Sequence, residues 1–108
     1  MPYDFVLPEE LPGFLNDTPG LLMIDVRDAD AFASAHYPGS SSIPLEQLQA
    51  QGLDTNSADQ PVLLICQLGK RAQMAAQALE SQHENPLYVL TGGLAACVEA
   101  GIALSSRA

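Results

Sequence analysis

One cysteine occupies a place in the sequence where a nucleophile would be useful. Cys66 directly follows the apolar run Val62–Ile65 and precedes a short stretch that contains Gly69. The run predicts a buried strand, and the glycine predicts a turn that leads into a helix. Ligands of open α/β sheets bind beyond the carboxyl ends of the strands. The sequence therefore predicts that Cys66 lies at a candidate active site.

Positive charge is concentrated next to this cysteine. The chain has 4 Lys and Arg residues in all, and two of them, Lys70 and Arg71, follow Cys66 closely. Backbone N–H groups of a turn and of a helix start bind small anions and favour the thiolate form of a cysteine. We therefore expect a Cys66 thiolate beside an anion-binding loop. The alternative interpretation is a buried strand cysteine followed by ordinary solvated helix residues.

Short apolar runs alternate with segments of helical pattern along the chain. The candidate strands are Phe5–Leu7, Leu21–Val26, Ser42–Ile43, Val62–Cys66 and Leu87–Leu90. Several of these runs do not alternate apolar with polar residues, which is typical of strands buried on both faces of a mostly parallel sheet. The pattern predicts an α/β domain with helices on both sides of the sheet.

Helices are expected between these strands. After Gly69, the spacing of four residues predicts one buried helical face: Ala72, Ala75, Ala76 and Leu79. Further helices are expected to begin at Pro8 and Asp28 and to lie within Gly92–Gly101. The polar stretch Gly52–Gln60 has no periodicity and predicts a surface loop.

Length and charge exclude several classes of function. The chain has 108 residues, so residues 1–108 are expected to form one domain. The formal net charge of −9 would repel nucleic acid and anionic membranes, and neither is an expected partner. No apolar run approaches the ~20 residues that a spanning helix needs, and the start lacks a basic signal-peptide region. We therefore expect the protein to remain in the cytoplasm.

The histidines and cysteines do not predict a metal site. His36 and His83 are far apart in the sequence, and neither has a known ligand spacing to Cys66 or Cys97. We interpret His83 as a solvated residue at a helix end. Two cysteines are too few for a disulfide scaffold, and a reducing compartment keeps them as thiols.

Three segments, taken in series, resemble the rhodanese family. They are Leu22–Arg27 leading to His36–Ser40 and Ile43–Leu45, the Cys66 loop, and Val89–Gly93 leading to Ala100 and Gly101. They occur in the family's order and spacing over nearly the whole chain. The resemblance implies a three-layer rhodanese-like α/β fold, in which a central, mainly parallel five-stranded sheet is flanked by helices.

The resemblance also implies residue roles. Cys66 matches the family's catalytic cysteine. The residues that match the loop whose backbone amides cradle the substrate sulfur and its oxyanion are Gln67, Leu68, Gly69, Lys70 and Arg71. Asp25 and Arg27 resemble residues that brace the strand end, with a substrate contact as the alternative role for Arg27. His36 resembles a neutral, hydrogen-bonded turn histidine rather than a catalytic base.

The chain departs from the family pattern at three places. Cys97 stands where many members carry a tryptophan, Tyr37 replaces an aliphatic residue, and Ala72 replaces a hydroxyl residue. We interpret Cys97 as a small core residue. The alternative is a resolving thiol, which could form a disulfide with Cys66 only if their Cα atoms lay within roughly 7 Å.

The activity that the resemblance implies is transfer of a sulfane sulfur through a Cys66 persulfide. The donor would be a small sulfur-containing anion such as thiosulfate, the acceptor would be a thiol, cyanide or a protein, and no cofactor is expected. One alternative is a noncatalytic sulfur-relay module for a protein partner. Another is a cysteine-dependent phosphatase or arsenate reductase. The phosphatase or reductase alternative is disfavoured, because the loop between Cys66 and Arg71 is one residue shorter than in tyrosine phosphatases.

Overall fold

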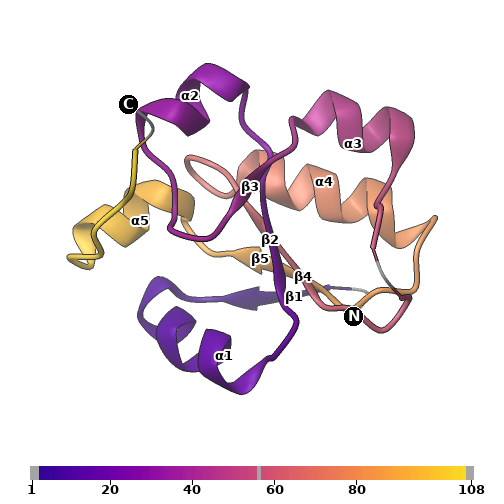
Figure 1. The fold of residues 1–108 in the computed structure, drawn as a ribbon, viewed down its shortest axis with the longest axis horizontal. Coiled ribbons are helices and arrows are strands. Elements are labelled where there is room, and N and C mark those ends of the chain that lie inside the picture. The colour runs from indigo at the N-terminus through magenta and orange to yellow at the C-terminus, as the bar shows by residue number, and fades with distance from the viewer. Residues whose placement is uncertain (1–2, 56, 107–108) are drawn as a thin grey trace.

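The chain alternates strands and helices along its length. The computed structural model describes residues 3–55 and 57–106. The strands are β1 (Tyr3–Val6), β2 (Leu22–Asp25), β3 (Ser41–Ser42), β4 (Val62–Ile65) and β5 (Leu87–Leu90). The helical elements, shown in Figure 1, are the short 3-10 helix η1 (Pro8–Glu10), α1 (Leu11–Asp17), α2 (Ala29–Ser34), α3 (Leu45–Gln51), α4 (Lys70–Glu80) and α5 (Gly93–Glu99).

The strands form one five-stranded sheet in the order β1-β5-β4-β2-β3. Every pairing between these strands is parallel. The predicted α/β architecture with a mainly parallel five-stranded sheet is therefore confirmed. Because the strands run the same way, their carboxyl ends meet at one edge of the sheet, and Cys66 directly follows β4, the central strand.

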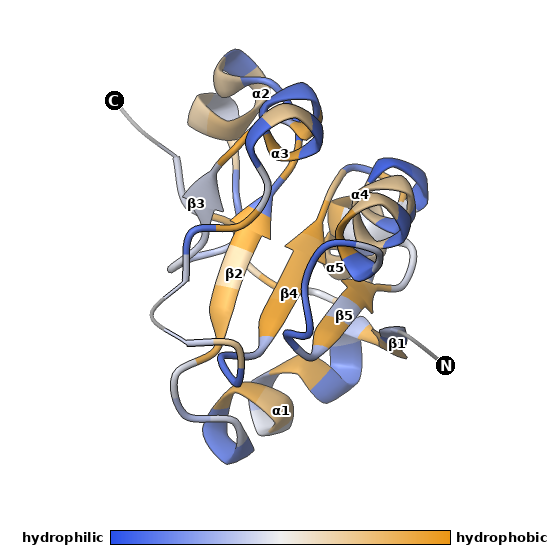
Figure 2. Cartoon of the chain, turned by 90° about the vertical axis from the view of Figure 1, so that its right-hand side faces the viewer, coloured by the Kyte–Doolittle hydropathy of each residue, from blue (hydrophilic) through white to orange (hydrophobic). Residues whose placement is uncertain are grey.

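Both faces of the sheet are buried, which explains the continuous apolar runs. Val62 and Leu64 of β4 pack into the core on one face, whereas Leu63 and Ile65 pack into the core on the other. All four side chains have 0% exposure. Figure 2 shows the resulting hydrophobic colour along β2 and β4. Burial of a side chain of this size contributes roughly 1.5–3 kcal/mol.

Helices cover the two faces as expected. On one face, α3 and α4 contribute to the core, and the predicted alanine stripe of α4 is fully buried together with Leu79. On the other face, Leu11 of α1 and Leu94 of α5 pack against the sheet. The small alanine side chains allow α4 to lie close to the strands. The start of α4 is thereby fixed relative to the end of β4.

Some element boundaries differ from the sequence prediction. Helix α3 was not predicted, because its seven residues bury only Leu45 and Leu48 and show too little periodicity. Leu7 lies outside β1 at the start of the 3-10 turn, and β3 ends before Ile43. These strands are edge strands and are short, so few apolar residues mark their ends.

The polar loop between α3 and β4 is held by two side chains that lie between α4 and β5. The interpretation of His83 as a solvated residue was wrong, because its ring is half-buried and its Nε2 accepts the N–H of Leu53 at 3.0 Å. Asn85 is buried, and its amide donates to Thr55 Oγ1 and to the carbonyls of Ser57 and Gln60. The loop is therefore tied to the body of the domain.

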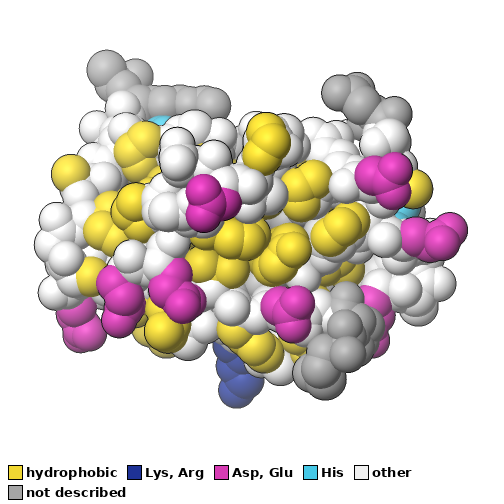
Figure 3. All heavy atoms as spheres, turned by 90° about the horizontal axis from the view of Figure 1, so that it is seen from below, with side chains coloured by type: hydrophobic (Ala, Val, Ile, Leu, Met, Phe, Trp, Pro, Cys, Tyr) yellow, Lys and Arg dark blue, Asp and Glu magenta, His cyan; other side chains and the backbone are white. Residues whose placement is uncertain are grey.

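The surface is acidic, and its positive charge is localised. Figure 3 shows one face on which apolar side chains gather in the middle, Asp and Glu side chains surround them, and cationic side chains are confined to one edge. Within residues 3–55 and 57–106, no helix has the length and apolar character required to cross a membrane. Charge complementarity with anions is consequently restricted to the few places where Lys and Arg cluster.

Candidate active site

The Cys66 sulfur accepts two main-chain hydrogen bonds. The N–H groups of Gly69 and Ala72 donate to Sγ at 3.0 and 3.3 Å. Ala72 is the third residue of α4, so its N–H has no partner within the helix and is free to bind the sulfur. The side chain is only 2% exposed, yet it lines a surface cavity. This arrangement stabilises negative charge on the sulfur of a residue that lines a cavity.

A glycine makes the tight turn around the sulfur feasible. Gly69 has φ +97°, in the left-handed region that other residues avoid. A Cβ at this position would also lie 3.3 Å from the backbone nitrogen of Gly92. The loop therefore turns into α4 in the space of a few residues and brings two N–H groups to the same sulfur.

Hydrogen bonds from the start of α5 fix the backbone of the Cys66 loop. The N–H groups of Leu94 and Ala95 donate to the carbonyls of Cys66 and Gln67 at 2.9 and 3.0 Å. Gly93 permits this approach, because a Cβ there would lie 2.4 Å from the Cys66 carbonyl oxygen. A peptide N–H points away from the carbonyl of the same peptide. Because α5 binds the carbonyls of these two peptides, the N–H groups of the same two peptides point away from α5.

A buried ion pair braces the loop from the side of β2. Arg27 Nε and Nη2 donate to the Asp25 carboxylate at 3.0 and 2.8 Å, and Nη2 also donates to the carbonyl of Ala35. Arg27 Nη1 reaches the Gln67 side-chain oxygen at 3.4 Å. Arg27 thus makes the bracing contacts that the sequence suggested and also faces the cavity. Asp25 offsets most of its charge.

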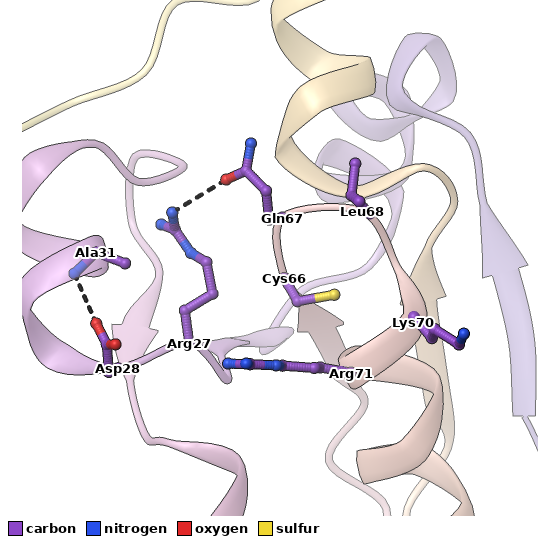
Figure 4. A pocket seen from close by; sticks show the side chains of 8 residues that line it. All are labelled: Arg27, Asp28, Ala31, Cys66, Gln67, Leu68, Lys70 and Arg71. Carbon is purple, nitrogen blue, oxygen red and sulfur yellow. Dashed lines mark hydrogen bonds between the residues drawn. The ribbon is translucent and has the colours of Figure 1, made fainter.

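Cys66 lines a cavity of about 370 Å³ between α2 and the Cys66 loop. The residues that line it are Arg27, Asp28, Ala31, Cys66, Gln67, Leu68, Lys70 and Arg71. In Figure 4 the Arg71 side chain extends from α4 toward α2, whereas Lys70 is directed to the other side of the loop. Arg71 is therefore the cation best placed to meet an anion in the cavity.

The predicted site residues fall into two groups by what they present to the site. Gly69 presents its backbone N–H to the sulfur, whereas the side chains of Gln67, Leu68 and Arg71 line the cavity. Lys70 borders the cavity, with its side chain directed away from Arg71. Leu68 is 70% exposed at the tip of the loop and offers an apolar surface.

Several contributors to the site were missed by the sequence reasoning, among them Asp28, Ala31 and Gly93. Asp28 was predicted only as a helix start, yet it also lines the cavity. Gly93 was noted only as part of a glycine pair, and its close approach to the Cys66 carbonyl depends on a contact between segments far apart in the sequence. The one local signal for such an approach is the glycine itself.

Cys97 lies in the core on the opposite face of the sheet from Cys66. It has 0% exposure and belongs to the apolar cluster with Leu63, Ile65 and Tyr37, and both cysteines are free thiols. Burial raises the pKa of Cys97, and burial together with the nearby Cys97 raises the pKa of Tyr37. Both groups therefore stay neutral at neutral pH, and the burial of Cys97 supports its interpretation as a small core residue.

His36 is a structural residue of the segment that follows α2. Its Nδ1 lies 2.8 Å from the carbonyl oxygen of Phe32, and its ring stacks on the Phe32 ring. A carbonyl only accepts hydrogen bonds, so Nδ1 carries the proton. The backbone of His36 also exchanges two hydrogen bonds with Ser105. Among the described residues, no group of three or more His, Cys, Asp or Glu side chains could hold a metal ion.

Substitution of Gly93 tests whether α5 fixes the loop. We expect Gly93→Ala to lower the free energy of unfolding by about 3–4 kcal/mol, because the new methyl would overlap the Cys66 carbonyl in addition to the strain of a positive φ. Gly101→Ala is the matched control, since its φ is +82° and a Cβ meets nothing within 4 Å. It should cost only about 1–2 kcal/mol. Equal losses in urea denaturation would contradict the proposed packing.

The environments of the two thiols predict different reactivity. Iodoacetamide at neutral pH should alkylate Cys66, which lines the cavity and accepts two N–H groups. Native Cys97 should not react, because it is sealed from solvent and its raised pKa keeps it protonated. Peptide mass spectrometry locates the label, and denatured protein labelled at both sites is the control. Faster labelling of Cys97 in the native protein would contradict this assignment.

Comparison with known proteins places this geometry in a family. The rhodanese-like domain family matches residues 7–100. A thiosulfate sulfurtransferase, GlpE, from Pseudomonas fluorescens is 37% identical over 76 residues, which cover 68% of this chain and 67% of that protein. The rhodanese-like domain of an Anabaena protein superposes with a TM-score of 0.82 at 21% identity, covering 98% of this chain and 80% of that one.

Two relatives from Bacillus subtilis are longer than the matched region. The chain spans 56% of the length of the protein named YqhL. It spans 33% of the putative sulfur carrier protein YrkF, to which it is 34% identical over 62 residues, 57% of this chain. The fold, the family match and the named relatives agree: the chain belongs to the rhodanese-like domain family.

Proposed function

We propose that this protein is a sulfurtransferase that moves a sulfane sulfur from a small anionic donor, such as thiosulfate, to a thiophilic acceptor through a persulfide on Cys66. The observation that carries the proposal is the pair of main-chain N–H groups on Cys66 Sγ at the wall of a cavity that Arg71 enters. In this proposal Cys66 is the catalytic residue, and Gln67, Leu68, Gly69, Lys70 and Arg71 bind the substrate.

In the first half-reaction the Cys66 thiolate attacks the outer sulfur of thiosulfate. A bond forms between Sγ and that sulfur, and the sulfur–sulfur bond of the donor breaks with its electron pair leaving on sulfite. The charge of the thiolate is carried over to the terminal sulfur of the persulfide. Two simple displacements replace one difficult transfer, which is covalent catalysis.

Charge stabilisation is the main contribution of the protein to this step. The donor and the leaving sulfite are both anions, and the chain as a whole carries −9. The loop N–H dipoles and the Arg71 guanidinium place positive charge where that negative charge develops. Because these groups are already oriented, they need no reorganisation during the reaction. The fixed loop backbone keeps those donors in place.

The second half-reaction transfers the terminal sulfur to a thiol, to cyanide or to a protein. A relay that serves only a protein partner is the alternative, and the relative named as a putative sulfur carrier supports it. Turnover with small acceptors at rates comparable to those with any protein acceptor favours an enzyme. We also propose a cytoplasmic location, because reducing conditions keep Cys66 as a thiol between cycles.

Removal of the nucleophile tests the proposal. Thiosulfate treatment should increase the intact mass of the wild-type protein by one sulfur atom, and cyanide should remove that sulfur. Cys66→Ser should gain no sulfur and lose thiosulfate:cyanide activity by at least about 1,000-fold, since a nucleophile in covalent catalysis is not replaced by a weaker one.

Cys97→Ala is the matched control for this experiment. Cys97 lies in the core on the far face of the sheet, so the variant should still gain one sulfur atom. Full activity of Cys66→Ser, or loss of sulfur loading only in Cys97→Ala, would refute the assignment of the nucleophile.

A further inference from the structure

Opposite charges face the active-site cavity without pairing. Asp28 at the start of α2 and Arg71 in the first turn of α4 both line it. Within the described residues the one salt bridge joins Arg27 to Asp25, so neither Asp28 nor Arg71 is neutralised by a direct ion pair. A ligand in the cavity can therefore meet both the carboxylate of Asp28 and the guanidinium of Arg71.

The Asp28 carboxylate uses one of its two oxygens in the structure. Its Oδ1 accepts the N–H of Ala31 at 2.9 Å and caps α2, as the dashed line in Figure 4 shows. No described group donates a hydrogen bond to Oδ2. The capping bond fixes the carboxylate at the cavity wall, and the second oxygen is available to a ligand.

A carboxylate is unfavourable for the donor but suits a different reactant. Thiosulfate is a dianion and gains nothing from Asp28. The cavity volume of about 370 Å³ also lies in the range of roughly 300–1,000 Å³ found for pockets that hold much larger ligands. Ala31 and Leu68 add apolar surface to the cavity wall. After sulfite leaves, this space can receive the acceptor.

We propose that the acceptor is a small thiol of the α-amino-acid class, which carries both an ammonium and a carboxylate group. Asp28 binds the ammonium group, Arg71 binds the carboxylate, and the methylene carbons contact the apolar wall. Asp28 is thus a specificity-determining residue. This inference rests on the sulfurtransferase function proposed above and names the acceptor class for the same site.

The transfer step is balanced without a further reactant. The acceptor thiol loses its proton to solvent, and its thiolate attacks the terminal sulfur of the Cys66 persulfide. A new sulfur–sulfur bond forms to the acceptor, and the bond to Cys66 Sγ breaks with its electron pair staying on Sγ. The products are the acceptor persulfide and the Cys66 thiolate, which the N–H groups of Gly69 and Ala72 again stabilise.

The test measures how fast persulfide-loaded protein loses sulfur to thiols that differ in charge. Protein is loaded with thiosulfate, freed of donor, and mixed with cysteamine, L-cysteine, 3-mercaptopropionate or 2-mercaptoethanol, with intact mass as the readout. In Asp28→Asn, the rates for cysteamine and L-cysteine relative to 2-mercaptoethanol should fall about two- to fivefold, the size expected for an exposed charge contact. The relative rate for 3-mercaptopropionate should not fall.

Asparagine retains the capping oxygen, so α2 should remain intact in this variant. Asp30→Asn is the matched control, because Asp30 carries the same charge in the same helix but does not line the cavity. Equal changes for all four thiols, or the same selectivity change in Asp30→Asn, would overturn the inference while leaving the sulfurtransferase function intact. Failure of the wild-type protein to load sulfur would instead refute the proposed function.

Discussion

The candidate active site depends on how the start of α5 holds the loop that follows β4. Two N–H groups of α5 bind the carbonyls of Cys66 and Gln67, and Gly93 allows the two backbones to approach. Fixing these carbonyls sets the direction of the following peptide planes. The loop can then close over the sulfur, with N–H groups supplied by its own turn and by α4. The site is therefore built mainly from backbone, and the fold rather than individual side chains positions it.

Charge is organised around that backbone site in two ways. The buried pair of Asp25 and Arg27 is nearly neutral and serves to join β2, the end of α2 and the loop. Arg71 and Asp28 remain unpaired and give the cavity its polarity. In a chain of net charge −9, this confines anion binding to one place and disfavours large polyanions. A small donor and a small dipolar acceptor suit such a cavity.

Local sequence patterns predicted the elements that carry Cys66. The apolar run before Cys66, the glycine in the turn and the alanine spacing of α4 were sufficient, because each reflects burial of a neighbouring stretch of chain. Contacts between distant segments were not predictable. The role of Gly93 depends on α5 meeting the Cys66 loop, and the bond from Leu53 to His83 joins segments 30 residues apart. Asp28 was recognised as a helix start, but its place on the cavity wall required the packing of α2 against the loop.

The central claim is that a sulfur held by main-chain donors receives a second sulfur in the cavity. A crystal structure of the thiosulfate-treated protein tests this claim most directly. It should show one additional sulfur atom bonded to Cys66 Sγ, within hydrogen-bonding distance of loop N–H groups, and an unchanged Cys97. An unmodified Cys66 after treatment, or an added sulfur directed away from the cavity and from those N–H groups, would contradict the account.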